Sequence, residues 1–251
     1  MFSAVPRTYE LVNHVLTLGF DIRWRRAAVR LAIRGDERIR LDVCTGTGEM
    51  AALLRASAPS SCVVMGIDFS GEMLRHARRT HKGSGILWIS AALPLLPVRE
   101  ATADLVTISF ATRNLCLSRE ALVAAFAEVR RTLRPGGRML IIETSQPRNR
   151  LLRLLFHTYV RAVVHPMGTL ISGTSRPYAY LASTILRFYD ADQLAGVLAD
   201  AGFDPVTHRP LLGGVAAVHT AHSGHPVGTC GQAKGWRRQA VGAHTQSRAL
   251  F

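Results

Sequence analysis

One stretch of the sequence decides the fold: Leu41-Asp42-Val43-Cys44-Thr45-Gly46-Thr47-Gly48-Glu49. The apolar run that ends at Val43 predicts a buried strand, and the Thr-Gly-Thr-Gly run breaks it. Met50, Leu53 and Leu54 then recur at helical spacing, so the break is a strand-to-helix turn. Glycine lets the backbone approach a ligand closely, and the first turn of a helix offers unpaired N–H groups beside it. The stretch therefore predicts a ligand-binding turn.

A second apolar run, residues 62–67, ends in Asp68, about 20 residues after Gly48. An acidic side chain at that place is positioned to accept hydrogen bonds from a ribose diol. The turn and the acid together predict a nucleoside site. The turn alone, Gly46-x-Gly48-x-x-Ala51, is also a permissible dinucleotide fingerprint.

The residue that bears on the choice of nucleoside is Glu49, in the first turn of the helix. Its carboxylate would repel a pyrophosphate and suit a cationic ligand such as S-adenosylmethionine, which carries a sulfonium and an amino-acid end. A carboxylate that merely complements the helix dipole is an equally good interpretation of this residue. These residues are therefore compatible with two classes of enzyme, a nicotinamide-dependent oxidoreductase and an S-adenosylmethionine-dependent enzyme.

Strand-like and helix-like segments alternate along the rest of the chain. The expected strands are 39–43, 62–67, 86–89, 105–110, 138–143, 206–209 and 215–219, the last two as an antiparallel hairpin. The expected helices between them are 71–80, 119–133 (stopped by Pro135-Gly136-Gly137) and 190–201. This order predicts a doubly wound α/β fold with a mostly parallel seven-stranded sheet. Ligands bind such sheets at the carboxyl ends of the strands, where Thr47, Asp68, Ala92, Ser109 and Glu143 fall.

Three segments lie outside this alternation. Residues 1–35 predict an N-terminal helical cap of two helices around Gly19, and residues 148–187 a helical insertion before the last strands. The domain is expected to span 1–220, followed by a basic, disordered tail at 221–251. In the insertion, Arg153, His157, Arg161 and His165 form a basic stripe. A solvated helix face is the commoner outcome of such a pattern, and a lid that meets lipid headgroups is the alternative.

The formal net charge is +14 at pH 7, from 31 Lys+Arg against 17 Asp+Glu. This balance favours an anionic partner, a membrane surface or nucleic acid, although genomic base composition explains an arginine excess equally well. In the tail, Trp236 beside Arg237 and Arg238 is no stacking platform, which argues against nucleic acid. No apolar run reaches transmembrane length, and the first ten residues do not resemble a signal peptide. The four cysteines lack paired or metal-like spacing, so reduced thiols in the cytoplasm and no metal site are expected.

Further stretches carry a family signature. They are Tyr9-Glu10-Leu11-Val12-Asn13 with Leu18-Gly19-Phe20 and Trp24; Thr107-Ile108-Ser109-Phe110-Ala111-Thr112-Arg113-Asn114; Arg130-Arg131-Thr132-Leu133-Arg134-Pro135-Gly136-Gly137-Arg138 through Glu143-Thr144-Ser145; and Tyr178-Ala179-Tyr180-Leu181 with Ala201-Gly202-Phe203. In these, over about residues 2–220, the chain resembles the quinone-pathway C-methyltransferases of the class I S-adenosylmethionine-dependent superfamily. Many methyltransferases share the Pro-Gly-Gly strand, whereas the Tyr…Asn…Trp entry and the Arg-Asn pair are particular to this family.

The resemblance implies a Rossmann-like methyltransferase fold, S-adenosylmethionine as cofactor and a set of residues that hold it. Six of them are Thr45, Gly46, Thr47, Gly48, Asp68 and Phe69. Ala92 and Leu93 are expected beside the adenine, and Ser109 under the methionine end. Three departures from the family pattern stand out. Ala92 replaces an Asp or Asn that would bond the adenine amino group, a loss of roughly 0.5–1.5 kcal/mol. Thr17 and Asp21 replace a Ser and a His, and Glu49 replaces an Asp.

The resemblance also implies a reaction: methyl transfer to a ring carbon of a demethylated prenyl-hydroquinone, in menaquinone or ubiquinone biosynthesis. Loss of a phenolic proton makes the ring carbon nucleophilic. Arg113 is expected to stabilise the phenolate as a cation, with Asn114 reaching the hydroxyls and Tyr9 bonding a ring oxygen. A structural ion pair is the alternative role for Arg113.

The same resemblance bears on the partners of the protein. The insertion is expected to provide an apolar channel for the prenyl tail, and the basic stripe a peripheral attachment to the inner face of an anionic membrane. Another phenolic or lipid acceptor, or a non-catalytic binding protein, are the alternatives on the same scaffold. The oligomeric state stays open, with a homodimer as one candidate.

Overall fold

The computed structural model describes residues 14, 17, 19–116, 118–164, 166 and 176–224. In this part of the chain seven strands form a sheet of order β3-β2-β1-β4-β5-β7-β6. They are β1 (Ile39–Val43), β2 (Val63–Asp68), β3 (Leu87–Ser90), β4 (Ala103–Ser109), β5 (Leu133–Thr144), β6 (Val206–Leu211) and β7 (Ala216–His222). β1 to β5 are parallel, and β7 is antiparallel to β5 and β6. The predicted doubly wound, mostly parallel sheet is confirmed.

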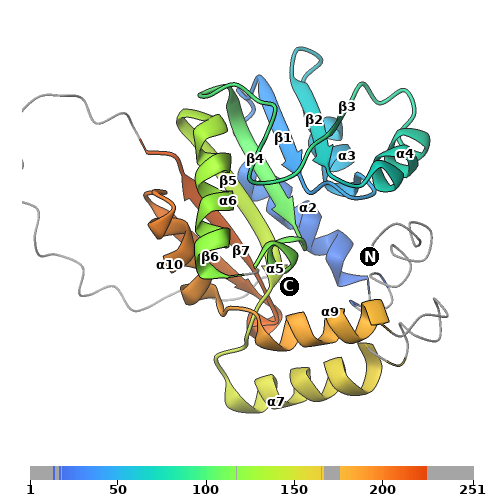
Figure 1. Ribbon diagram of the computed structural model, residues 1–251, viewed down its shortest axis with the longest axis vertical. Helices are drawn as coiled ribbons and strands as arrows, with labels where there is room; N and C mark the ends of the chain where they lie inside the picture. The colour runs from blue at the N-terminus through green and yellow to red at the C-terminus, as the bar shows by residue number, and fades with distance from the viewer. Residues whose placement is uncertain are drawn as a thin grey trace, which may run out of the picture.

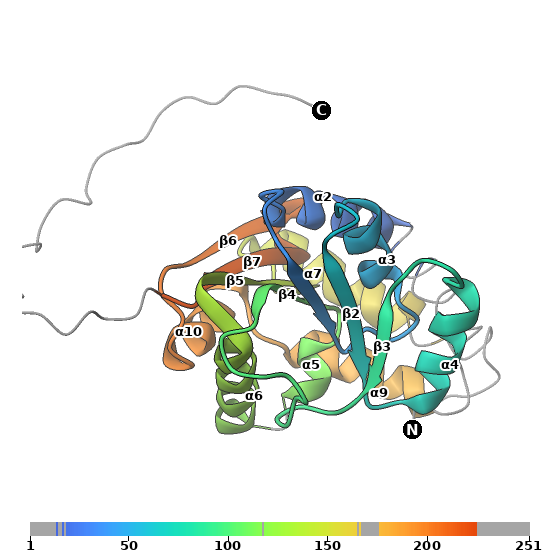
Figure 2. The same cartoon turned by 90° about the horizontal axis from the view of Figure 1, so that it is seen from above.

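Helices cover both faces of this sheet (Figures 1 and 2). They are α2 (Phe20–Ala32), α3 (Glu49–Ala56), α4 (Gly71–Thr80), α5 (Thr112–Leu115), α6 (Arg119–Thr132), α7 (Arg150–Tyr159), α9 (Arg176–Arg187) and α10 (Ala191–Asp200). Seen from above in Figure 2, α2 and α3 lie over one face of the sheet and α6 and α10 over the other. A buried apolar cluster fills each of the two layers.

The central strand β4 explains the double layer. It lies between β1 and β5, so both of its faces are covered, and six of its seven residues are buried. Leu105 joins the cluster under α2 and α3, whereas Val106 and Ile108 join the cluster under α6 and α10. A strand buried on both faces needs apolar residues at consecutive positions rather than alternation, which is the pattern that the sequence shows.

Polar side chains fix where several helices begin. Ser118 Oγ accepts a hydrogen bond from the Ala121 amide at the start of α6 (3.1 Å). Asp190 and Gln193 form a reciprocal capping box at the start of α10, with hydrogen bonds of 2.8 and 3.0 Å. Each cap satisfies amides that the first helical turn leaves unpaired, so these positions set the register of the helix on the sheet.

Some predicted boundaries were wrong. α6 ends at Thr132, before the Pro-Gly-Gly stop, because Leu133 is already extended and pairs with Ala103. Pro135 then falls within β5, where a register shift between Ala103 and Leu105 leaves the ladder irregular and a proline is tolerated. β7 continues to His222, so residues 221 and 222 belong to the sheet and not to the tail. The rest of the predicted tail (225–251) and the first helix of the cap lie outside the described residues, apart from His14 and Thr17.

The predicted insertion leaves the sheet after β5. α7 continues into a π-helical turn, Val160–Val164, and α9 packs against that turn through a small cluster that includes Val160, Ala182 and Ile185. In Figure 1, α7 and α9 lie side by side beyond the end of the sheet to which the parallel strands point. The insertion therefore stands next to the edge where ligands bind in such folds.

The basic stripe of the insertion is not one solvated face. Arg153 Nε donates to the Pro147 carbonyl (2.8 Å), and His157 Nε2 donates to Gln146 Oε1 (2.8 Å). Arg161 is exposed, and His165 lies outside the described residues. The carbonyl and amide oxygens at the base of the insertion attract the first two members of the stripe. Apolar side chains occupy outward positions on α7 instead, namely Leu151, Leu154 and Leu155.

His219 on β7 is a buried histidine whose charge state affects stability. It is almost wholly excluded from solvent, and its Nε2 donates to the Ala191 carbonyl (2.9 Å). The ring of His208, which pairs with Asp192, lies 5.5 Å away. Burial lowers the pKa of His219 from 6.5 to about 4. The unfolded chain therefore binds a proton at a pH where the folded chain does not.

We predict that His219→Gln removes a pH-dependent part of the stability. In the native protein this histidine makes the free energy of unfolding fall as the pH drops from 6.5 towards 4, by about 3 kcal/mol. Glutamine can keep the hydrogen bond to Ala191 but does not titrate. Urea unfolding of both proteins across this interval gives the difference, and parallel pH profiles would contradict the prediction.

Candidate functional site

The glycine turn follows β1 as predicted and leads into α3. Gly46 (φ 55°) and Gly48 (φ 87°) adopt left-handed conformations that disfavour residues with a side chain. The Gly48 amide donates to the Thr45 carbonyl (2.9 Å) and closes the turn. A Cβ atom on Gly48 would lie 2.5 Å from the Trp88 ring on β3. Gly48 is therefore packed tightly against a side chain of β3, and the backbone at both positions favours glycine.

Asp68, the last residue of β2, holds this turn from the side. Its Oδ2 accepts a hydrogen bond from the Gly46 amide (2.8 Å), and its Oδ1 accepts one from the Ser70 amide (2.8 Å). Burial raises the pKa of Asp68, and these amide donors partly offset that effect. Asp68 thus stands at the carboxyl end of its strand with both carboxylate oxygens oriented.

Asp42, just before the turn, was not given a role from the sequence. It is buried, and it accepts hydrogen bonds from the hydroxyls of Thr45 (2.5 Å) and Thr107 (2.7 Å). Burial raises the pKa of Asp42 to about 6. This carboxylate ties the turn to β1 and β4 from below. An acid in a mostly buried strand, directly before a glycine turn, is a signal that points to it.

The turn and Asp68 open on a cavity of about 370 Å³ at the carboxyl ends of β1, β2 and β4. Most of the predicted cofactor residues line it: Thr45, Gly46, Thr47, Asp68, Phe69, Ala92, Leu93 and Ser109. Gly48 is instead packed behind the turn against Trp88. Asn114, predicted as catalytic, also lines this cavity, as do Met73 and Tyr180. We call it the nucleoside cavity.

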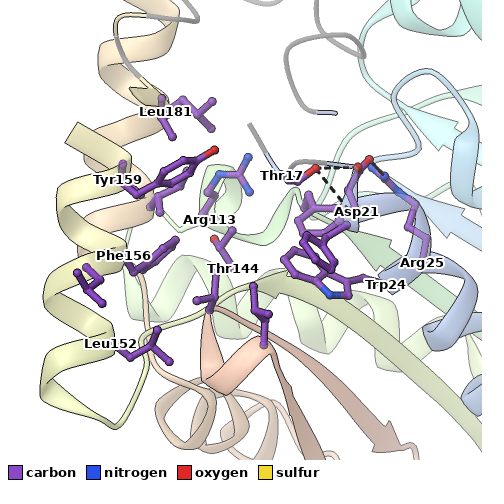
Figure 3. A pocket seen from close by; sticks show the side chains of 18 residues that line it. Thr17, Asp21, Trp24, Arg25, Arg113, Thr144, Leu152, Phe156, Tyr159 and Leu181 are labelled. Atoms are coloured by element: carbon purple, nitrogen blue, oxygen red, sulfur yellow. Dashed lines mark hydrogen bonds and ion pairs between the residues drawn. The ribbon is translucent and has the colours of Figure 1, made fainter. Parts of the chain in front are cut away.

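A second cavity of about 300 Å³ lies beside the first, between α2, the sheet and the insertion. We call it the apolar cavity, because its lining consists mainly of apolar side chains. Figure 3 shows Leu152, Phe156 and Tyr159 of α7 and Leu181 of α9 on one side, and Thr17, Asp21 and Trp24 on the other. The insertion thus supplies much of the wall of the apolar cavity. Tyr9, the third predicted catalytic residue, lies outside the described residues.

Arg113 lies in the wall of the apolar cavity, on α5. Its Nη1 donates to Glu143 Oε1 (2.6 Å), and both side chains are buried. Glu143 also accepts the amide of Thr144 (2.8 Å). The ion pair weighed from the sequence is therefore present, and it holds a cation at the edge of the apolar cavity. Although Arg113 and Asn114 are consecutive, the structure places them in different cavities.

Arg25 and Phe110 are the two described residues that line both cavities. The Arg25 guanidinium carbon lies 5.0 Å from the centroid of the Phe110 ring. Its Nη1 donates to Asp21 (2.7 Å), and its Nη2 contacts Glu49 (3.0 Å). From the sequence, Arg25 was only one of several arginines on its helix. The i, i+4 spacing from Asp21 was the available signal.

Three residues that depart from the family pattern, Thr17, Asp21 and Glu49, lie next to one another at the cap and the turn. The Thr17 hydroxyl donates to Asp21 Oδ1 (2.7 Å), and His14 Nδ1 donates to Asp21 Oδ2 (2.8 Å). His14 Nε2 also lies 3.4 Å from Glu49 Oε1. Glu49 therefore faces an arginine and a histidine of the cap, in addition to the N-terminus of α3. The remaining departure, Ala92, lines the nucleoside cavity with a methyl group that forms no hydrogen bond.

Comparison with known proteins decides the family. Residues 1–223 match the profile of the ubiE/COQ5 methyltransferase family. The chain belongs to this family. It is 38% identical to the demethylmenaquinone methyltransferase of Thermus thermophilus, over 87% of this chain and 98% of that protein. It is 39% identical to the ubiquinone/menaquinone biosynthesis C-methyltransferase UbiE of Syntrophotalea carbinolica, over 88% of this chain and 91% of that protein.

The fold of this ubiE/COQ5-family protein is similar to those of solved methyltransferase structures. A putative methyltransferase from Bacillus halodurans aligns with a TM-score of 0.55 at 16% identity, over 80% of this chain and 98% of that one. Human N-acetylserotonin methyltransferase, solved in complex with S-adenosylmethionine, aligns with a TM-score of 0.58 at 17% identity, over 82% of this chain and 54% of that one. The fold is thus that of Rossmann-like methyltransferases.

We predict that Gly48→Ala weakens cofactor binding at least tenfold and lowers stability. The added Cβ would meet Trp88 at 2.5 Å, and the left-handed backbone costs about 1 kcal/mol more for alanine. Gly71→Ala is the matched control, since a Cβ there meets nothing within 4 Å and φ is not left-handed. Calorimetric titration with S-adenosylhomocysteine measures the effect. Equal affinities for the two variants would contradict the geometry of the turn.

Proposed function

We propose that the protein transfers the methyl group of S-adenosylmethionine to a ring carbon of a demethylated prenyl-hydroquinone, in menaquinone or ubiquinone biosynthesis. Family membership supports this function, since relatives such as the Thermus thermophilus protein carry the corresponding names. The observation that carries the proposal is the pair of cavities, one suited to a nucleoside and one apolar, which meet at Arg25 and Phe110. Methyl transfer needs two ligands held in adjoining spaces.

The nucleoside cavity fits the cofactor. The Asp68 carboxylate suits a ribose diol, because its oxygens are already oriented by the Gly46 and Ser70 amides. The glycine turn leaves room for the backbone to approach the ligand, and Ser109 lies at the end of β4, where the methionine end is expected. When bound, the cofactor supplies an electrophilic methyl group on a sulfonium. The methyltransferase family also favours this cofactor over the nicotinamide that the turn alone would allow.

The apolar cavity fits the acceptor. Phe156, Leu152 and Leu181 offer a surface for an aromatic ring and the start of a prenyl chain. Two residues that line the cavity, Leu155 and Leu212, are more than half exposed, so the cavity reaches the surface on the α7 side. A prenyl tail longer than the cavity would leave by this route.

Arg113 is the residue that we assign to the acceptor oxygen. Its guanidinium stays protonated, so it stabilises a phenolate rather than removing the proton. Glu143 fixes its orientation by the 2.6 Å ion pair, which leaves the cation preorganised at the cavity wall. Asn114 lines the nucleoside cavity, where its side-chain amide can orient the cofactor. The predicted contact of Tyr9 with a ring oxygen remains part of the proposal.

A methyl-transfer assay tests the function. Purified protein is incubated with methyl-labelled S-adenosylmethionine and a panel of chemically reduced demethylmenaquinols, ubiquinol precursors and unrelated phenols. We expect a C-methylated prenyl-hydroquinone, identified by mass and fragmentation. Methylation only of another phenol or lipid would show that the acceptor is not a prenyl-hydroquinone. A chain that binds the cofactor and methylates nothing in the panel would indicate a non-catalytic family member.

We predict that the double variant Arg113→Met/Glu143→Gln loses turnover but keeps cofactor affinity. Replacing both partners avoids leaving a buried charge, which would destabilise the protein by about 3–5 kcal/mol. Turnover should fall about 10²–10³-fold, as expected when a donor to a developing oxyanion is removed. The affinity for S-adenosylhomocysteine should change less than twofold. Unchanged turnover would assign Arg113 a purely structural role.

We also propose that the protein contacts an anionic membrane peripherally, through the outer side of α7. Among the described residues, none of the helices is long and apolar enough to span a membrane. Leu151 (66% exposed) and Leu154 (60%) protrude from α7, the helix whose Leu152 and Leu155 line the apolar cavity. The net charge of +14 favours an anionic surface. This surface replaces the basic stripe as the proposed contact. A homodimer stays a prediction.

We predict that Leu151→Gln/Leu154→Gln lowers the affinity for vesicles of phosphatidylglycerol and phosphatidylcholine by about a hundredfold. Burying one leucine contributes about 1.5–3 kcal/mol, so two polar replacements remove most of an apolar contact. Leu95→Gln is the matched control, because Leu95 is 80% exposed but lies in the loop after β3. Cosedimentation measures the bound fraction. Equal losses in both variants, or none in either, would exclude α7 as the contact.

A further inference from the structure

A chain of three charged side chains runs from one cavity to the other. Among the described residues, Asp21 lines the apolar cavity only, and Glu49 lines the nucleoside cavity only. Arg25 lines both and joins them, with distances of 2.7 Å to Asp21 Oδ2 and 3.0 Å to Glu49 Oε2. Figure 3 shows Asp21 and Arg25 on the side of the apolar cavity opposite Tyr159. The ion-pair chain therefore has one end in each binding space.

The partners of this chain belong to elements that hold the two ligands. Asp21 and Arg25 are on α2, which walls the apolar cavity, whereas Glu49 is the first residue of α3, directly after the glycine turn. Arg25 is only 7% exposed, and its guanidinium stands over the Phe110 ring. Breaking a buried ion pair is costly because a charge is left uncompensated. Arg25 thus ties the position of α2 to that of the turn.

The charges of the group explain why it responds to ligands. Burial alone would raise the pKa of Asp21, but hydrogen bonds from Thr17 and His14 and the charge of Arg25 hold it below its usual value, so Asp21 stays ionised. Two carboxylates then share one guanidinium, with His14 beside both. A cationic ligand near Glu49 changes the electrostatic potential at Arg25 from one end of the ion-pair chain. A ligand that contacts Asp21 changes it from the other end.

We propose that Arg25 is a positioning residue that couples the two cavities, so that cofactor and acceptor bind cooperatively. Occupation of the nucleoside cavity fixes Glu49 and the turn, and through Arg25 it fixes α2 and the wall of the apolar cavity. The acceptor then meets a wall that is already ordered. The identity of that acceptor rests on the proposed function, whereas the coupling through Arg25 does not. A residue that only anchors α2 would affect stability and leave the coupling intact.

The first test needs the cofactor side alone. Hydrogen exchange is followed by mass spectrometry with and without saturating S-adenosylhomocysteine. In the native protein, we expect slower exchange both in the turn (residues 44–50) and in α2, by about fivefold or more in α2. In Arg25→Met the turn should still be protected, and the protection of α2 should disappear. Arg26→Met is the matched control, since Arg26 is exposed on the same helix.

The second test adds the acceptor side. The dissociation constant of S-adenosylhomocysteine is measured with and without an oxidised short-chain prenyl-naphthoquinone, which cannot be methylated. We expect about fivefold tighter binding with the quinone in the native protein and in Arg26→Met, and less than twofold in Arg25→Met. A native protein that binds no quinone would contradict the proposed acceptor, while the exchange measurement still decides the role of Arg25.

Two results would overturn the proposal. One is protection of α2 in Arg25→Met equal to that in the native protein; the other is an unchanged coupling factor in that variant. If Arg25→Met does not fold, Glu49→Met removes both oxygens that face Arg25 and His14 and keeps the length of the side chain. Protection of α2 by S-adenosylhomocysteine that survives in Glu49→Met would then count equally against the proposal.

Discussion

One hydrogen bond, from the Gly46 amide to the Asp68 carboxylate, joins the two halves of the nucleoside cavity. It connects the turn after β1 to the end of β2, so the backbone of the glycine turn and the acid that we propose as the ribose ligand are held next to each other. The bond forms because parallel pairing of β1 and β2 brings the ends of both strands to the same edge. The sheet therefore sets the position of Asp68 relative to the Gly46 backbone.

The second cavity depends on a different part of the chain. Its apolar wall comes largely from α7, the π-helical turn and α9, which interrupt the alternation of strands and helices. Charged groups at its edge are neutralised in pairs, Arg113 with Glu143 and Arg25 with Asp21. A buried cation needs such a partner, since an isolated charge in an apolar space would be unstable. The protein thus places polar chemistry at the boundary of an apolar space without leaving any of these four charges unpaired.

Much of this arrangement could be predicted from the sequence. The positions of the seven strands along the chain, the glycine turn and the place of Asp68 follow from local patterns. Hydrophobic periodicity and glycine placement act over only a few residues. Resemblance to the family supplied the expected roles of Ser109, Ala92 and Arg113, and the structure places all three in cavity walls.

Other features could not be predicted, because they depend on contacts between distant segments. Arg25 bridges α2 and α3, Asp42 meets Thr107 of β4, and Glu143 meets Arg113. The inward turn of Arg153 and His157 depends on acceptors in the loop before α7, at Pro147 and Gln146. The end of α6 at Thr132 was missed because pairing of Leu133 with Ala103 outweighs the local stop signal.

The most direct test of transfer between the two cavities is a crystal structure of the ternary complex with S-adenosylhomocysteine and a demethylated prenyl-naphthoquinone. We expect the sulfur in the nucleoside cavity and the quinone ring in the apolar cavity, on opposite sides of the gap at Arg25 and Phe110. The acceptor carbon should then lie about 3–3.5 Å from the place that a transferred methyl would occupy. A quinone bound elsewhere, or a sulfur turned away from Phe110, would contradict the proposed reaction path.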